Sequence, residues 1–336
     1  VFVEDKFRTL FAMLFGAGCL ILLEKDDANP MRKHAARMAV LFAIGLLHSI
    51  FLASNDVLRA YALAGLVLPI LRGLSPYALI AIAIGLIAVH LGGGIVTFGA
   101  GIVDFYAGRA GSDAALFAER NFGRDQGAIE YAMRLGQEGF WERAARRAGS
   151  IPGQISVLLA SLPINLAAMV LGMAMWRNRM LAAEWRTFRL QRLSAICAVI
   201  AIPALLAMAW WVTNGDFPAA LAGPVALVFS APFDTLLGLA YAFLAMAFLG
   251  SSAAFTQRLA AVGRLSLTNY VATSALFAAI FAVWGLGLFG QVSRSGAFAL
   301  SFVPIFAMLI WSPLWLRRLG QGPLERLWRG AARVLA

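Results

Sequence analysis

The amino-acid sequence predicts an all-α protein, a polytopic bundle of transmembrane helices. Of its 336 residues, 61% are hydrophobic and 13% are charged, whereas soluble domains average about 45–50% apolar and about 25% charged residues. Apolar runs recur along the chain, and several approach the length of about 20 residues that a spanning helix needs. These observations exclude a soluble enzyme and indicate an integral membrane protein.

Nine apolar runs are candidate spans. In order they are Lys6–Leu22, Ala36–Ala53, Val57–Leu71, Tyr77–Phe98, Ile155–Trp176, Leu193–Val212, Phe233–Leu249, Leu265–Phe289 and Ala297–Leu316. The third run is short and depends on the break at Ser54-Asn55-Asp56, where Asn55 is the expected N-cap. An odd number of spans with the C-terminus inside places Val1 outside. Because the chain starts without Met and Glu4-Asp5-Lys6 runs straight into the first span, we expect at least one preceding helix and ten or more spans in all.

The basic residues give the expected orientation. The chain carries 28 Lys and Arg against 17 Asp and Glu, a net charge of +11. Because they lie between apolar runs and not on one face, they favour membrane orientation over nucleic-acid binding. With the segment after the first run in the cytoplasm, short inner segments hold 17 of them, one long outer loop holds 7, and the other outer positions are Lys6, Arg8, Arg59 and Arg294. Short cytoplasmic loops are normally rich in Lys and Arg, which places the C-terminus inside.

Two polar regions interrupt this pattern. Residues 99–154 form an external loop in which Ser112 is expected to cap a helix over Asp113–Asn121, followed by an amphipathic helix over Ala128–Arg147. After Gly322-Pro323, apolar and arginine residues alternate with helical spacing, as in a helix on the inner leaflet. The predicted domains are therefore a four-span bundle (1–98), the external loop (99–154), a five-span bundle (155–316) and a cytoplasmic amphipathic tail (317–336).

The sequence predicts neither a metal site nor a nucleotide-binding motif. Cys19 and Cys197 lie in separate apolar runs without CxxC spacing, so no metal site is expected. The segment Gly285–Gly290 matches GxGxxG but follows no strand, so it is not a nucleotide fingerprint.

Ionisable residues within or beside spans are costly and are functional candidates. His48 and His90 both come out roughly 9 Å below the outer surface, counting about 1.5 Å per residue. Two histidines at one depth are suited to passing a proton between them or to binding the same substrate. The alternative is that each hydrogen-bonds a neighbouring carbonyl or hydroxyl group.

Other polar groups beside the spans are also candidates. Asp56 and Arg59 can pair on one face at the start of a helix. Asp234 follows a helix-start pattern, so a first-turn acid is the alternative to a membrane charge. Arg264 precedes a stretch that includes Asn269 and Tyr270, and such polar groups inside a span must face protein or a cavity.

Several motifs together carry a family resemblance. They are Lys6–Gly18, Gly45–His48, Asn55–Gly65, Leu171–Ala174, Gly263–Tyr270 with Ser274, Gly285–Gly290 and Gly322–Arg329. On these motifs the chain resembles the YeiB-like family of bacterial membrane proteins, which implies a multi-pass protein of the bacterial plasma (inner) membrane with a C-terminal domain of unknown function. The usual Gln before the serine of the eighth helix is Thr273 here.

That family is similar in arrangement to transmembrane acyltransferases such as heparan-α-glucosaminide N-acetyltransferase, which pass an acyl group from cytoplasmic acyl-CoA to an acceptor on the other side. Their first-helix region includes a catalytic histidine, and this chain starts after the corresponding stretch.

The first functional hypothesis is therefore a membrane acyltransferase with acyl-CoA as a co-substrate and no bound cofactor. His48 acts as general base, and Asp56 or Asp234 orients it. Arg8 or Arg59 steadies the acceptor or a developing oxyanion. The remaining substrate-binding candidates are His90, Arg264, Asn269 and Tyr270.

Two alternatives stay open. One is a transporter or permease for a small anionic or amphipathic solute, and the other is a scaffold without turnover. The expected partners are membrane lipids, a small-molecule substrate and further copies of the chain in a homo-oligomer.

Overall fold

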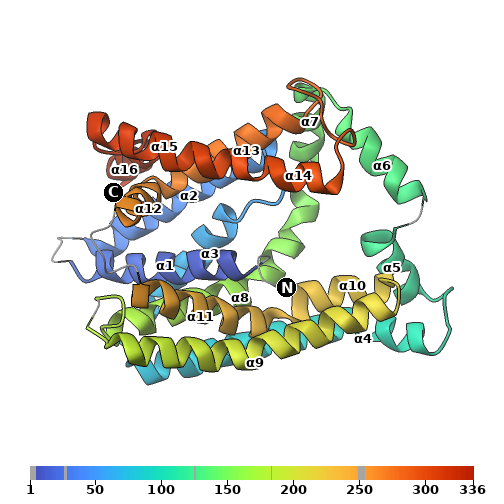
Figure 1. The fold of residues 1–336 in the computed structure, drawn as a ribbon, viewed down its shortest axis with the longest axis horizontal. Helices are drawn as coiled ribbons and strands as arrows, with labels where there is room; N and C mark the ends of the chain where they lie inside the picture. The colour runs from blue at the N-terminus through green and yellow to red at the C-terminus, as the bar shows by residue number, and fades with distance from the viewer. Residues whose placement is uncertain (1–4, 26–28, 125, 183, 249–253) are drawn as a thin grey trace. The chain divides into compact units, whose positions relative to one another are not determined.

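The computed structural model describes residues 5–25, 29–124, 126–182, 184–248 and 254–336, and every regular element within them is a helix (Figure 1). Seven helical segments among these residues are long and apolar enough to cross a membrane. They are α1 (Lys6–Leu23), α2 (Pro30–Phe51), α4 (Pro76–Tyr106), α8 (Ile151–Arg177), α9 (Thr187–Asn214), α11 (Ala231–Phe248) and the pair α14 (Arg294–Leu300) and α15 (Phe302–Leu319). The predicted fold class, an all-α multi-pass membrane protein, is confirmed.

Two of the nine expected spans are shorter helices. The third is α3 (Leu58–Leu71), with 14 residues, and the eighth is α13 (Ser266–Phe281), with 16. At about 1.5 Å per residue, neither reaches the roughly 30 Å of a bilayer core. A further short apolar segment, α10 (Ala219–Pro224), continues into the π-helical turn η1 (Val225–Phe229).

The eighth run was expected to stay helical to Phe289, and this boundary is wrong. The helix ends at Phe281, and the chain turns back so that the amide of Leu286 donates to the Ala279 carbonyl at 2.8 Å. Gly287 and Gly290 have φ values of 67° and 73°, which glycine adopts without steric cost. Hydropathy alone does not register such a turn. The end of the seventh run, at Leu249, lies outside the described residues.

The segment predicted to be an external loop contains three helices where two were expected. Ser112 caps α5 (Asp113–Phe122) as predicted, because its hydroxyl accepts the Ala115 amide at 3.1 Å. The single helix expected over Ala128–Arg147 is instead α6 (Gln126–Gly136) followed by α7 (Phe140–Gly149). Arg143 ends α6 by donating to the carbonyls of Leu135 and Gly136, at 3.1 and 3.2 Å. Glycine at the junction favours this break.

The chain forms two compact units, each assembled from separate segments. The first comprises Val1–Asp27, Leu63–Ala128 and Val157–Gly250, and the second comprises Ala28–Ala62, Ile129–Ser156 and Ser251–Ala336. Each unit is described by itself.

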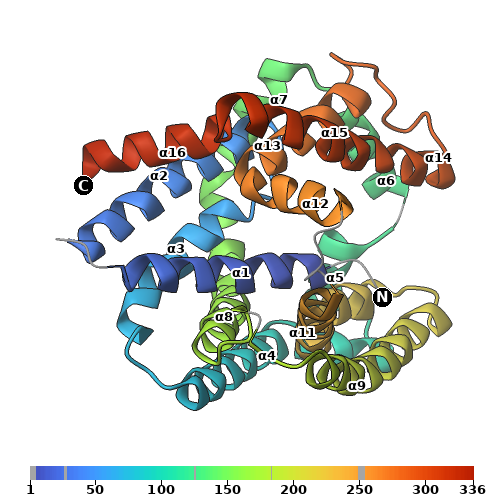
Figure 2. The ribbon, with the colours of Figure 1, turned by 60° about the vertical axis from the view of Figure 1, so that its left-hand side comes forward.

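In the first unit, close helix contacts rest on small residues. Helices α9 and α11 pack side by side through Ala201, Leu205, Leu237 and Ala240 (Figure 2). Helices α1 and α8 approach at Gly16 and Gly172, where an added Cβ would overlap backbone atoms of the opposite helix. Small residues let membrane helices approach closely, since lipid provides no hydrophobic drive between them.

In the second unit, the C-terminal helix α16 (Pro323–Leu335) packs along α2 (Figure 2). Ala332 is buried against α2, and the Trp328 indole donates to the Arg37 carbonyl at 2.7 Å. Helix α16 is strongly amphipathic, which confirms the predicted amphipathic helix, and its Leu327 and Val334 side chains remain exposed. Helix α12 (Ala254–Arg264) packs against α15 in the same unit.

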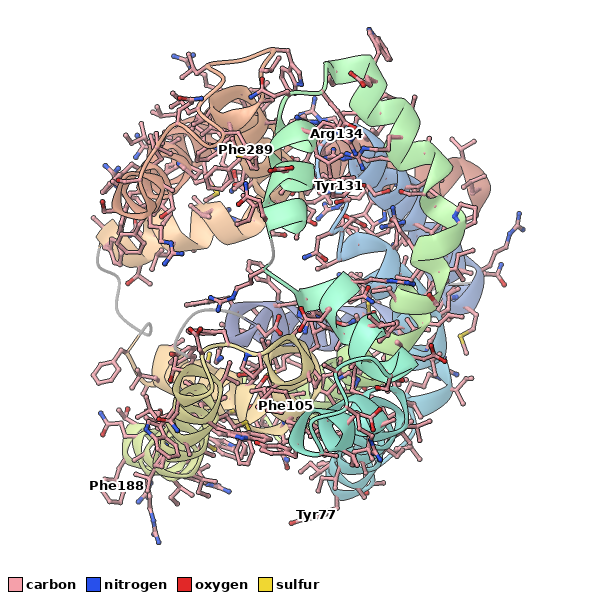
Figure 3. The ribbon with its side chains drawn as sticks, turned by 90° about the vertical axis from the view of Figure 1, so that its right-hand side faces the viewer. Tyr77, Phe105, Tyr131, Arg134, Phe188 and Phe289 are labelled. Atoms are coloured by element: carbon pink, nitrogen blue, oxygen red, sulfur yellow. The ribbon has the colours of Figure 1, made fainter. Side chains whose placement is uncertain are left out.

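Large apolar side chains cover much of the outer surface. Tyr77 on α4 and Phe188 on α9 point away from their helices (Figure 3) and are 84% and 74% exposed. Many exposed leucine, isoleucine and phenylalanine residues accompany them on the long helices. Exposed apolar side chains in such number on long apolar helices indicate contact with lipid.

Candidate functional site

The strongest candidate site surrounds His48 in the second unit. His48 lies one turn before the end of α2, and its side chain is 1% exposed. Its Nδ1 lies 2.9 Å from Oδ1 of Asp56, whose side chain is fully buried. Its Nε2 lies 2.9 Å from the Ser274 hydroxyl of α13. One imidazole thus lies between a carboxylate and a hydroxyl group.

A glycine allows the Asp56 carboxylate to approach α2. Gly45 lies three residues before His48, and a Cβ at that position would lie 2.7 Å from Asp56 Oδ2 and 2.9 Å from the Arg59 amide nitrogen. That amide donates to Asp56 Oδ2 at 2.9 Å. The side chain that caps the start of α3 is therefore Asp56, not the expected Asn55, because its carboxylate is turned inward and accepts the Arg59 amide of the first helical turn.

The Asp56 carboxylate has further partners. The Tyr270 hydroxyl donates to Oδ1 at 3.2 Å and accepts the Val57 amide at 3.3 Å. The Arg59 Nε lies 3.6 Å from Oδ2, and its Nη2 donates to the Gln154 side chain at 3.0 Å. A buried carboxylate needs a nearby cation and hydrogen-bond donors, and these groups supply both to Asp56.

The electrostatics favour one form of the His48 ring. A carboxylate beside Nδ1 favours the tautomer with its hydrogen there, which leaves Nε2 as the acceptor for a hydroxyl hydrogen. The Asp56 oxygen lies off the direction of the Nδ1–H bond, so the contact is electrostatic and is not a straight hydrogen bond. The arrangement can withdraw a proton from a hydroxyl group at Nε2.

Asn269 and Arg264, both candidates from the sequence, have different surroundings. The Asn269 amide is engaged by the protein: its Oδ1 accepts the Trp311 indole at 3.0 Å, and its Nδ2 donates to the Val262 carbonyl at 3.0 Å and to Ser312. It joins α12, α13 and α15. Arg264 is the last residue of α12 and is exposed.

The first turn of α13 is capped from α16. The buried Glu325 carboxylate accepts the amides of Leu267 and Thr268 at 2.9 and 3.0 Å, together with the Thr268 hydroxyl. No side chain of α13 itself caps this end. Glu325 therefore fixes the start of the helix that carries Tyr270 and Ser274.

The remaining candidates belong to the first unit. Asp234 is buried, lies 2.6 Å from Lys6 Nζ and accepts the Ser230 hydroxyl at 2.7 Å. Arg8 lies 3.0 Å from Asp5. The His90 Nε2 lies 3.0 Å from the Leu227 carbonyl, as the alternative interpretation of that histidine proposed.

The structure thus groups four of the nine sequence candidates, His48, Asp56, Arg59 and Tyr270, in one site of the second unit. The residue that the sequence candidates lacked is Ser274. A signal existed, because Ser274 follows Tyr270 by four residues and so lies on the same helical face.

Comparison with known proteins identifies the family. The profile described as "Protein of unknown function (DUF418)" matches residues 154–334. The chain is 30% identical to "Uncharacterized protein YeiB" of Escherichia coli (strain K12) over 340 residues, which cover 97% of this chain and 81% of the relative. It is 26% identical to "Uncharacterized protein YxaH" of Bacillus subtilis (strain 168) over 337 residues, 98% of this chain and 80% of that one. No solved structure matches significantly. The chain therefore belongs to the YeiB-like family of multi-pass membrane proteins that carry the DUF418 domain.

Proposed function

We propose that the protein is a membrane acyltransferase that moves an acyl group from acyl-CoA on the cytoplasmic side to a hydroxyl-bearing acceptor on the outer side. The observation that carries this proposal is the His48 imidazole held between a buried carboxylate and a hydroxyl group. A histidine whose second nitrogen faces a carboxylate is suited to general-base chemistry on an O–H group.

The proposed roles follow from the contacts of each residue. His48 Nε2 accepts the proton of the attacking hydroxyl group, and Asp56 stabilises the resulting imidazolium. Tyr270 and Arg59 hold Asp56 in place, because both lie against its carboxylate oxygens. The thioester is cleaved by attack of a hydroxyl oxygen activated in this way: the carbon–sulfur bond breaks, the proton from His48 passes to the departing thiolate, and the acyl group ends on the acceptor.

Exposed arginines in the second unit are the proposed site for the phosphates of acyl-CoA. Arg264 ends α12, while Arg317 and Arg318 lie in the last turn of α15. Asn269 bridges these two helices near the same ends, through the Val262 carbonyl and the Ser312 hydroxyl. Guanidinium groups bind phosphate oxygens in a bidentate manner. We place this end and the C-terminus in the cytoplasm of a bacterial cell, because 17 of the 28 basic residues fall in the segments assigned to that side.

The test uses the purified protein in lipid nanodiscs with labelled acetyl-CoA and a panel of sugar and peptidoglycan acceptors. We expect transfer of label to one acceptor class and a loss of about 10²–10⁴-fold in His48→Ala, the usual contribution of a general base. Asp56→Asn should also lose most activity, whereas the matched control Asp113→Asn, at an exposed position on α5, should not. The proposal fails if the wild-type protein neither binds acetyl-CoA nor releases CoA with any acceptor.

A second candidate function is transport of a small anionic or amphipathic solute. The Lys6–Asp234 pair favours it, because both side chains are only 5% exposed and lie in membrane-spanning helices. The π-helical turn η1 directly precedes the helix that carries Asp234, and such turns are frequent at functional sites. Uptake of an unmodified solute by proteoliposomes, abolished by Asp234→Asn, would support transport. Covalent change of the solute would count against it.

A further inference from the structure

We propose that Ser274 is the nucleophile of the reaction and carries the acyl group as a serine ester between donor and acceptor. This inference rests on the proposed acyl transfer and adds an obligatory covalent intermediate. It starts from one distance, the 2.9 Å between the Ser274 hydroxyl oxygen and His48 Nε2.

The three groups have the order that activates a serine. Asp56 faces Nδ1 of His48, and Ser274 faces Nε2 of the same ring. They come from a loop, from α2 and from α13 respectively, and residues 48 and 274 are 226 positions apart. A carboxylate, imidazole and hydroxyl group in this order form the arrangement that lets serine attack a carbonyl carbon, whatever fold carries it.

The neighbouring hydroxyl groups have other partners. The Ser49 hydroxyl donates to the Leu46 carbonyl at 2.8 Å, and the Tyr270 hydroxyl donates to Asp56 at 3.2 Å. The Thr273 hydroxyl donates to the Asn269 carbonyl at 2.8 Å. The alternative acceptor for Ser274 is the Tyr270 carbonyl, at the longer distance of 3.4 Å. Among these groups, the Ser274 hydroxyl is the one placed at the basic nitrogen of His48.

Ser274 is also partly accessible. Its side chain is half-buried on α13, whereas His48 and Asp56 are buried. A nucleophile must meet an external acyl group, while its base and the carboxylate that orients the base act best when shielded from water, because electrostatic interactions are stronger there. The partly accessible Ser274 and the buried His48 and Asp56 meet these two requirements.

The chemistry has two balanced halves. In the first, Ser274 gives its proton to His48 Nε2 and its oxygen attacks the thioester carbon. The carbon–sulfur bond then breaks, CoA thiolate takes the proton from His48, and the acyl group remains on Ser274. In the second, His48 takes the proton of the acceptor hydroxyl group, the acceptor oxygen attacks the acyl carbon, and Ser274 leaves with the proton returned by His48. No oxidant or reductant is required.

The first test detects the intermediate directly. The full chain in nanodiscs is incubated with acetyl-CoA without acceptor, quenched in acid and digested for peptide mass spectrometry. We expect one acetyl group on the peptide containing Ser274, released when acceptor is added before the quench. Acylation should be absent in Ser274→Ala and in His48→Ala. The matched control is Ser161→Ala, because Ser161 is a half-buried helical serine whose hydroxyl donates to the Leu158 carbonyl of its own helix at 2.7 Å.

The second test is kinetic. A covalent intermediate predicts parallel double-reciprocal plots when donor and acceptor are varied, and CoA release without acceptor limited to one equivalent per protein. Ser274→Cys, which preserves a nucleophile, should retain acylation as a thioester that hydroxylamine cleaves. Thermal unfolding of each variant shows whether it is folded.

The outcomes separate this inference from the proposed function. Transfer that depends on His48 but persists in Ser274→Ala at more than about a tenth of the wild-type rate would overturn the serine intermediate and leave acyl transfer intact. Acetyl found on another residue would do the same. Absence of any CoA release from the wild-type protein, across the acceptor panel, would overturn both.

Discussion

Removal of the Glu325 carboxylate tests how the site helix is held. Glu325 of α16 accepts the Leu267 and Thr268 amides at the start of α13 and the Thr268 hydroxyl. Glu325→Ala removes all three hydrogen bonds at once. Glu325→Gln keeps one carbonyl oxygen that can accept both amides but loses the negative charge.

The size of each effect follows from the groups left without partners. A buried amide without an acceptor costs about 1–3 kcal/mol, so two amides give a loss of about 3 kcal/mol in Glu325→Ala. Hydrogen bonds to a charged group are roughly twice as strong as neutral ones, so Glu325→Gln should lose about 1 kcal/mol. With about 2–4 °C of apparent melting temperature per kcal/mol for units of this size, the expected decreases are about 6–12 °C and about 2–4 °C.

The assay is thermal unfolding of the purified protein in one detergent, at one scan rate, because membrane proteins often unfold irreversibly. Hydrogen exchange at the Leu267 and Thr268 amides provides a local readout and should accelerate in Glu325→Ala. The control is Glu184→Ala, which removes an exposed carboxylate paired with Arg179 at 3.3 Å; exposed pairs contribute about 0–1 kcal/mol. A Glu325→Ala protein that melts like Glu184→Ala, with unchanged exchange, would refute the reasoning.

Three further predictions concern packing and charge. Gly172→Ala should lower the melting temperature, with a cost of about 1–3 kcal/mol, because its Cβ would overlap backbone atoms of α1. Lys6→Met should cost about 3–5 kcal/mol, because it leaves the buried Asp234 carboxylate without its cation, while the double variant with Asp234→Leu should recover most of that loss. Arg146 donates to Glu138 and lowers the pKa of that carboxyl below its ordinary value of 4.5. This contribution to stability is therefore complete above that value and is lost as the pH falls through the lower pKa of the folded state, so Glu138→Gln should flatten the acid side of the stability profile.

Matched controls accompany these variants. Gly153→Ala lies on the same helix as Gly172 but in open space, so it should be neutral or slightly stabilising. Glu119→Gln is an exposed change on α5 and should leave the acid profile unchanged. A Gly172→Ala protein as stable as Gly153→Ala, a double variant no better than Lys6→Met alone, or an unchanged profile in Glu138→Gln would contradict the respective prediction.

Local signals in the sequence predict local structure well. Apolar length located the long helices, and the Ser112 cap and the alternation after Gly322 located α5 and α16. The signal fails where backbone geometry, and not hydropathy, ends a helix. Residues 275–289 carry only apolar side chains and glycine, yet the helix ends at Phe281 and the chain turns back through Gly285 and Gly287.

For the candidate site too, one part could be predicted from the sequence and the other could not. His48, Asp56 and Arg59 lie within twelve residues across one tight turn, so their proximity could be predicted from the sequence. The opposite side of the site comes from α13, more than 200 residues away, and no spacing rule brings Ser274 to His48. Asn269 shows the converse: its polar amide beside a span indicated a ligand site, but its hydrogen bonds hold three helices together.

The sequence was enough to identify a helical membrane protein, to locate its long apolar helices, and to make His48 and Asp56 candidate site residues on either side of one turn. Tertiary structure alone decided that a serine lies at the other nitrogen of that histidine, and that Glu325 holds the helix which carries it. Hydropathy, helix capping and charge depend on residues that are neighbours in the sequence, so the structure that they decide can be predicted from short segments. The placement of Ser274 beside His48 depends instead on which helix faces pack together. In a membrane, helices associate through close packing and through hydrogen bonds between polar groups that are distant in the sequence.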